Sequence, residues 1–137
     1  MKNEDSQIKD YKTMKKIINT LKAPQPIGPY SQAILSKDTL YCSGQIALNK
    51  KGNFIAKNIE EETIQIIKNI SEVLKEANMN LSNIVKTTIF LKNMDDFSLV
   101  NSIYEKSFSL CPPARETVEV SALPKNANIE ITVIAVL

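Results

Sequence analysis

One long amphipathic helix is the feature of this sequence that most limits the folds open to it. Apolar side chains recur at spacings of three and four residues between positions 59 and 77, the pattern of a helix with one buried face. Asn58 precedes this stripe as a candidate N-cap, and Asn78 follows it as a candidate left-handed C-cap residue. Such a helix must bury its stripe against another layer, which the rest of the chain has to supply.

β-patterned runs on both sides of the helix supply this layer. They are rich in β-branched residues or alternate apolar with polar side chains, and turn residues separate them. The predicted strands are residues 16–21, 31–36, 39–46, 84–91, 116–122 and 129–136. The second and third form a hairpin across Lys37 and Asp38. The last two flank a turn at 123–126, which would make them a strand pair in the sheet.

A second helix is expected at 97–108, with Asp95 or Asp96 as its N-cap. Its apolar stripe also carries Asn101, a polar side chain that needs a partner either in the local backbone or in a ligand. The order of elements predicts an α+β domain whose two helices cover one face of a mixed sheet. The other face stays partly apolar, so we expect a homo-oligomer with its sheets turned inward.

The length of 137 residues and the modest charge limit the classes of protein to which this chain can belong. A net charge of +2 does not indicate an extended nucleic-acid surface, and no apolar run is long enough for a membrane span. Residues 1–15 are polar and lack the apolar core of a secretory signal, so we expect a flexible extension before a domain at 16–137. We therefore expect a cytoplasmic protein; the acidic residues of the extension disfavour a mitochondrial presequence.

The sequence contains no histidine, and this excludes several catalytic designs. A Ser-His-Asp or Cys-His unit cannot be built within the chain, and a His-ligated metal is excluded. Cys42 and Cys111 are too few for a disulfide scaffold or a zinc site, and glycine-rich phosphate loops are missing. Acid–base chemistry near neutral pH therefore falls to Asp, Glu, Tyr, Lys, Cys or the chain terminus.

Arg115 and Glu130 are the leading candidates for that chemistry. Arg115 follows two prolines and an alanine, so its guanidinium leaves a restricted segment. Glu130 interrupts a strand that otherwise reads as buried on both faces, where a carboxylate is costly unless it is paired or its pKa is raised. A surface salt bridge between neighbouring strands explains the same two residues. The residues alone thus predict an anion site with an adjacent carboxylate, and no more.

Tyr30 and Gly44 are two further positions of interest. The stretch 24–29 holds three prolines and a glycine, and this stiff loop fixes Tyr30 in place. Gly44 lies inside a strand pattern, where a glycine indicates a bulge or the close approach of another group. An aromatic cover for the core and a plain bulge are the alternative interpretations.

Seven short motifs occur in a characteristic order along the chain. They are Ala23-Pro24, Gly28-Pro29-Tyr30-Ser31-Gln32-Ala33, Ser43-Gly44-Gln45, Asn101-x-x-Tyr104, Pro113-Ala114-Arg115, Leu123-Pro124-Lys125 and Ile129-Glu130-Ile131. Together they resemble the signature of the Rid proteins, the reactive intermediate deaminases also called the YjgF family, and the RidA branch is the best match. The resemblance covers about residues 16–137. It implies a chorismate-mutase-like α+β fold and a homotrimer around a barrel of inward-turned sheets.

The resemblance also implies an activity, the hydrolysis of 2-imino acids and their enamine tautomers to 2-keto acids and ammonia, without a metal or organic cofactor. The substrates would be 2-iminobutanoate and 2-iminopropanoate. Arg115 would bind the substrate carboxylate in bidentate fashion, and Glu130 would hold and activate the attacking water. Tyr30 would close the pocket from the neighbouring subunit. The pocket would be lined further by Ser43, Gly44, Asn101 and Thr117.

Two departures and two alternatives qualify this expectation. Thr117 stands where the family often has Cys, and the segment 109–112 is shorter than in typical members, which affects the rim of the cleft. One alternative is a single-stranded RNA endonuclease or translation inhibitor, for which Lys12, Lys15 and Lys16 offer only a small basic patch. The other alternative is a chaperone-like or ligand-sensing trimer without catalysis.

Overall fold

The computed structural model describes residues 15–137. The expected domain at 16–137 falls within this range, whereas the predicted flexible extension, apart from Lys15, lies outside the described residues. None of the helices in the described range combines the length and apolar character that a membrane crossing requires.

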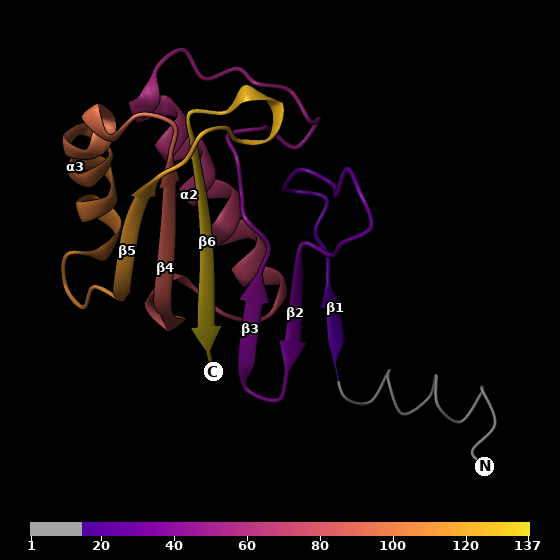
Figure 1. The fold of residues 1–137 in the computed structure, drawn as a ribbon. Coiled ribbons are helices and arrows are strands. Elements are labelled where there is room, and N and C mark those ends of the chain that lie inside the picture. Colours follow the sequence, from indigo (N-terminus) through magenta and orange to yellow (C-terminus); the bar gives the residue numbers. More distant parts are fainter. Residues whose placement is uncertain (1–14) are drawn as a thin grey trace.

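Six strands form one mixed sheet, and two helices cover one of its faces (Figure 1). The strands lie side by side in the order β1-β2-β3-β6-β4-β5. They are β1 (Lys16–Ile18), β2 (Ala33–Ser36), β3 (Thr39–Cys42), β4 (Ile84–Leu91), β5 (Ala114–Glu119) and β6 (Ile129–Val136). The helices are α2 (Ile59–Glu76) and α3 (Phe97–Phe108), and short 3-10 turns lie at Leu81–Asn83, Met94–Asp96 and Pro124–Asn126. The predicted α+β class is confirmed.

The two ends of helix α2 are set by a capping hydrogen bond at its start and a left-handed residue after its end. The Asn58 side chain accepts a hydrogen bond of 2.9 Å from the backbone N–H of Glu61, which satisfies a donor that the first turn leaves open. Past the last turn, Asn78 takes the left-handed conformation with φ of 57°. Both caps confirm the sequence prediction.

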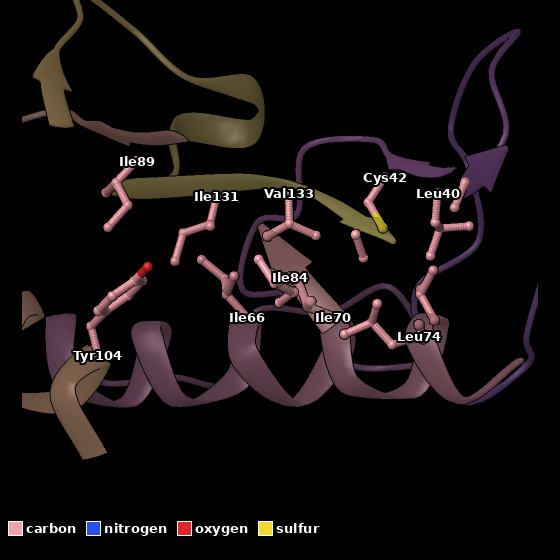
Figure 2. Close-up of a cluster of buried hydrophobic side chains, with 14 of the residues drawn as sticks. Leu40, Cys42, Ile66, Ile70, Leu74, Ile84, Ile89, Tyr104, Ile131 and Val133 are labelled. Carbon is pink, nitrogen blue, oxygen red and sulfur yellow. The ribbon is translucent and has the colours of Figure 1, made fainter. Parts of the chain in front are cut away.

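The main core lies between α2 and the sheet (Figure 2). Ile66 and Leu74 point from the helix toward the strands and are fully buried, as is Leu40 from β3. On β6, the odd-numbered residues Ile131 and Val133 point toward the helix, because side chains alternate between the two faces of a strand. Each fully buried aliphatic side chain contributes about 1.5–3 kcal/mol relative to an exposed one.

Helix α3 begins differently from the prediction. Asp96 occupies the N-cap position but its side chain makes no capping hydrogen bond, so neither expected aspartate caps the helix. Asn93 instead accepts a hydrogen bond from the backbone N–H of Asp95 and begins the turn Met94–Asp96, which runs directly into α3. The cap therefore lies one short turn earlier than the apolar stripe suggested.

The predicted pairing of the last two strands is wrong, because β4 lies between β5 and β6. Strand β5 runs parallel to β4, and β6 runs antiparallel to it. A parallel neighbour needs a crossover connection, and α3 provides it. The turn at 123–126 therefore joins two strands that are separated in the sheet.

The sheet face away from the helices is partly apolar, as expected. Tyr41 on β3 and Val118 on β5 are 51% and 41% exposed there. On the same face, Lys86 on β4 and Glu116 on β5 form an ion pair with an N–O distance of 2.7 Å. Large apolar side chains left exposed beside a charged pair are typical of a surface that binds another protein.

Candidate active site

A small hollow near the start of the central strand β6 brings Tyr30, Gly44 and Glu130 together; we call it the carboxylate hollow. Its volume is about 60 Å³, and Pro24 and Pro124 also line it. A space of this size holds a few water molecules. Tyr30 and Glu130 of the same chain thus line one hollow, and the closure of a pocket by Tyr30 from a neighbouring subunit stays a prediction.

Gly44 makes room for Glu130. A Cβ placed on Gly44 would lie 2.8 Å from the Glu130 Cδ and 3.0 Å from its Cγ, well inside the usual separation of about 3.5–4.0 Å between carbon atoms. The adjoining Gln45 pairs with Ile131 through backbone hydrogen bonds of 2.8 and 3.0 Å, and this pairing brings the two segments together. Of the two interpretations of this glycine, close approach is the one that the geometry supports.

The Glu130 carboxylate is half-buried and unpaired. Burial raises the pKa of Glu130 above its ordinary value, and within residues 15–137 no cation or hydrogen-bond donor offsets the effect. The expectation of a raised pKa is confirmed. A carboxylate with a raised pKa is a stronger base than an exposed one, and a bound water would donate the hydrogen bond that it lacks.

Buried hydrogen bonds hold the Tyr30 loop in place. Gln32 is 1% exposed; its Oε1 accepts from the Thr20 N–H at 2.7 Å, and its Nε2 donates to the carbonyls of Thr20 and Pro24, both at 3.0 Å. The Ser43 hydroxyl donates to the Ser31 carbonyl at 2.6 Å, so this predicted pocket residue serves the loop. The Tyr30 hydroxyl accepts from a backbone N–H at 3.2 Å, which leaves its own proton available.

A second and larger hollow lies between α3 and the start of β5; we call it the guanidinium hollow. Its volume is about 590 Å³, and Asn101, Tyr104 and Arg115 line it. The Arg115 Cζ lies 4.8 Å from the centre of the Tyr104 ring and 5.7 Å from that of Phe97. Glu105 also lines this hollow, but Arg115 forms no ion pair with any described carboxylate. The guanidinium is thus supported by rings while its N–H donors stay available.

Arg115 is the only arginine in the sequence, which otherwise uses lysine for positive charge. A guanidinium differs from an ammonium in its planar fork of N–H donors, which matches a carboxylate with two parallel hydrogen bonds. The single arginine therefore occupies a position where an unpaired cation lies over aromatic rings beside a hollow.

Within one chain, Arg115 and Glu130 lie on opposite faces of the sheet. Arg115 is the register partner of Thr87, which is buried on the helix-covered face. Glu130 pairs with Phe90 on the open face, between residues that are buried toward the helices. The expectation that one face of a strand pair carries both groups is therefore wrong, and so is the interpretation as a salt bridge between them.

Thr117 shares the face of Arg115, as predicted, because two residues along a strand return to the same side. Its hydroxyl oxygen is buried and has no hydrogen-bond partner in the described chain. Leaving such a group unsatisfied costs about 1–3 kcal/mol. A polar partner from outside the chain would recover this free energy.

Sequence reasoning missed the residues that support the site from beneath. Glu62 is 5% exposed and accepts a hydrogen bond of 2.8 Å from the Asn128 side chain, two residues before Glu130. The signal was a glutamate among the apolar stripe residues of α2. Gln32 belongs to one of the seven motifs, but its hydrogen bonds to Thr20 could not be predicted, because the two residues are 12 positions apart in the sequence.

The two cysteines stay apart from this chemistry. Cys42 is buried, and burial raises the pKa of its thiol to about 12, so it stays protonated at neutral pH. Cys111 is exposed and free. Among residues 15–137, no three Cys, Asp or Glu side chains gather closely enough to hold a metal ion.

Comparison with known proteins places the chain in a family. The family profile described as Endoribonuclease L-PSP matches residues 20–137. The chain belongs to this family. A RutC family protein of Saccharolobus solfataricus is 54% identical over 123 residues, covering 89% of this chain and 98% of the relative. The human protein named 2-iminobutanoate/2-iminopropanoate deaminase is 44% identical over 124 residues, covering 90% of each.

A solved structure agrees with this assignment. The crystal structure of a Yersinia pestis protein of unknown function, described as a member of the conserved Rid protein family, is 50% identical. It superposes with a TM-score of 0.87 over 90% of this chain and 99% of the other. The membership in the Rid family predicted from the seven motifs is confirmed.

Proposed function

We propose that this protein is a cofactor-independent deaminase that hydrolyses 2-imino acids, such as 2-iminobutanoate and 2-iminopropanoate, to 2-keto acids and ammonia. The observation that carries the proposal is a pair of unpaired charges: a guanidinium with free donors and a half-buried carboxylate with a raised pKa. The human relative is named for this reaction. The chemistry suits a chain without histidine, because an imine is already electrophilic.

The complete site would form between chains. The carboxylate hollow opens on one part of the surface and the guanidinium hollow on another, so joining them requires two different patches of two copies. Contacts between two different patches are heterologous, and they form a closed ring when the rotation between copies closes, whereas a two-fold dimer uses the same patch twice. We propose a homotrimer in which Tyr30 and Glu130 of one subunit meet Arg115 of the next. The partly apolar open face of the sheet supports such an assembly.

In the proposed mechanism, Arg115 binds the substrate carboxylate with two parallel N–H···O hydrogen bonds. The Thr117 hydroxyl and the Asn101 amide supply further polar contacts to the same end of the substrate. This end fixes the imine carbon over the carboxylate hollow. Orientation of this kind can lower the barrier by several kcal/mol, about 7–11 in the best cases.

Glu130 then takes a proton from a water molecule in the carboxylate hollow, and the water oxygen forms a bond to the imine carbon. The nitrogen of the adduct takes that proton from Glu130, which gives the carbinolamine. Glu130 then accepts the proton of the carbinolamine hydroxyl and passes it to nitrogen as the C–N bond breaks and the carbonyl forms, so one water is consumed and one ammonia leaves. The Tyr30 hydroxyl, whose own proton is available, can stabilise the adduct. The role fits the pKa of Glu130, because burial raises it toward neutral pH.

The test is a coupled reaction with a threonine dehydratase, in which semicarbazide traps the imine before it hydrolyses. Active protein should lower the trapped fraction, and Arg115→Ala should abolish the effect. Lys106→Ala removes a positive charge from the last turn of the neighbouring helix and serves as the matched control. If wild type leaves the trapped fraction unchanged, the assignment to this substrate class fails and a non-catalytic role gains support.

A second candidate function is cleavage of single-stranded RNA, because the family description names an endoribonuclease. The observation that favours it is a surface hollow of about 430 Å³ lined by Lys22, Lys50, Lys51 and Lys68. Clustered lysines attract a phosphate backbone in a salt-dependent manner. RNA cleavage that survives Arg115→Ala and is lost when these four lysines become glutamine would support this function. Cleavage abolished by Arg115→Ala would instead assign it to the imine site.

A further inference from the structure

We infer that Tyr104 is the positioning residue for Arg115: its ring holds the guanidinium at the angle that receives a carboxylate, and Thr87 fixes the ring. The inference rests on the proposed function, in which Arg115 binds the substrate carboxylate. It adds a role that the seven motifs do not assign, since Tyr104 would act on substrate binding through Arg115.

The first observation is the position of the guanidinium over the Tyr104 ring. The Arg115 Cζ lies 4.8 Å from the centre of the Tyr104 ring, within the distance of about 6 Å at which a cation and an aromatic face attract each other. Phe97, two turns earlier on the same helix face, lies farther away at 5.7 Å. A ring supports the flat face of a guanidinium and leaves the N–H groups along its edge free.

The second observation is how the ring itself is held. The hydroxyls of Tyr104 and Thr87 are hydrogen-bonded at 2.8 Å, and the Thr87 side chain is fully buried. Figure 2 shows the Tyr104 hydroxyl directed from α3 toward the sheet. Thr87 is also the register partner of Arg115 on the neighbouring strand. The residue that anchors the ring therefore lies directly beside the residue that the ring supports.

Packing fixes the remaining freedom of the ring. The Phe108 ring centre lies 4.4 Å from that of Tyr104 at an interplanar angle of 32°. Burial raises the pKa of Tyr104, so its hydroxyl stays neutral and brings no competing charge to the guanidinium. A carboxylate in this place would also hold Arg115, but it would occupy the N–H donors that the substrate needs. An aromatic support avoids that competition.

The single arginine makes the inference measurable by NMR, because one side-chain Nε–H signal reports on Arg115 alone. Protons above an aromatic face are shifted upfield by the ring current. In the full-length wild type, we expect an upfield signal that shifts on titration with 2-oxobutanoate, the keto-acid product, as a carboxylate probe. Tyr104→Leu should move this signal to the position of a free arginine.

Kinetics then separate positioning from stability. Tyr104→Leu should raise KM for the imine about tenfold, from the loss of the cation–π contact, and change kcat much less. Tyr104→Phe keeps the ring and should restore the signal and most of the affinity, with KM raised about two- to threefold by loss of the hydroxyl bond. Phe54→Leu removes an aromatic ring outside both hollows and should change neither readout.

The outcomes distinguish the inference from the function on which it rests. If Arg115→Ala binds 2-oxobutanoate as well as wild type, the carboxylate role of Arg115 fails. If Arg115→Ala loses binding while Tyr104→Leu keeps the wild-type KM and Nε–H signal, the function stands and the inference is overturned. Should Tyr104→Leu not fold, Thr87→Val tests the anchor by itself. Like Tyr104→Phe, this variant loses the hydroxyl bond and should raise KM about two- to threefold, so an unchanged KM would also overturn the inference.

Discussion

The two hollows hold their charged groups by different physical means. In the carboxylate hollow, buried hydrogen bonds centred on Gln32 fix the loop around Glu130, and the space is small. In the guanidinium hollow, aromatic rings support Arg115, and the space is about ten times larger, 590 against 60 Å³. Each support leaves its charge uncompensated. The comparison teaches that a charge kept for a ligand is best positioned by neighbours that do not neutralise it.

The sheet contributes to this arrangement by separating the two charges. Arg115 and Glu130 lie on opposite faces, so they cannot form the ion pair that would occupy both. Joining the hollows by assembly would bring the charges close only with a substrate between them. The strongest tests of the comparison therefore either combine the two hollows in mixed oligomers or disturb one hollow at a time.

The largest expected effect is a loss and partial recovery of activity in mixed oligomers. Arg115→Ala and Glu130→Gln should each lower kcat/KM about 10²- to 10⁴-fold, the range for removal of a general base or an equivalent contact. Random mixing of the two variants should restore about a quarter of the sites, because each site would take one group from each of two adjacent chains. The dehydratase assay on co-refolded protein measures this recovery. No recovery above the single variants would contradict a shared site.

Gly44→Ala should disturb the carboxylate hollow alone. The added Cβ would overlap the Glu130 carboxyl group, which must swing away, so we expect kcat to fall about 10- to 100-fold with little change in thermal stability. Gly28→Ala is the matched control, because its Cβ would meet only ordinary contacts at 3.5 Å with the Tyr30 ring. Equal activities of the two variants would show that Glu130 is not held at Gly44.

Substitutions beneath the two hollows should separate hydrogen-bonded from aromatic support. Gln32→Leu leaves the Thr20 N–H and the Pro24 carbonyl without partners, whereas the Thr20 carbonyl keeps its hydrogen bond from Gln25. We expect the free energy of unfolding to fall by about 2–4 kcal/mol. Tyr104→Phe removes one hydrogen bond and should lower it by about 0.5–1.5 kcal/mol. Denaturant unfolding at one fixed protein concentration compares them. A larger loss for Tyr104→Phe would reverse our view of the two supports.

The smallest effect is a pH dependence that belongs to Glu130. Its pKa is raised in the folded protein, so activity that needs the carboxylate should fall as pH drops through that raised value. The same shift favours folding below the ordinary pKa of 4.5, and that contribution is lost as pH rises through the raised value. Glu130→Gln should therefore gain stability relative to wild type as pH rises across this window. If the difference in melting temperature between the two proteins stays the same across this pH window, the raised pKa is contradicted.

The local parts of the fold could be predicted from the sequence, since their signals are local. The Asn58 cap, the stripe of α2 and the strand Ile84–Leu91 each depend on neighbouring residues, and all three are confirmed. The neighbour of β5 could not be predicted, because a short turn at 123–126 suggests adjacency while the crossover through α3 decides it.

The division of the site could not be predicted for a related reason. Strand alternation places Arg115 and Thr117 on one side, but the largely exposed strand β5 does not indicate which side faces the helices. Tyr30 joins Glu130 only because Gln32 ties its loop to Thr20 and Pro24. Contacts of this kind depend on residues distant in the sequence.

The contact between Gly44 and Glu130 also limits how the two positions can change over evolutionary time. Any side chain at position 44 collides with glutamate at 130, so the effect of each mutation depends on the other. A lineage that shortens residue 130 first can later accept alanine or serine at 44, whereas the reverse order passes through an intermediate with a displaced carboxylate. The two positions are therefore expected to change together, with residue 130 leading.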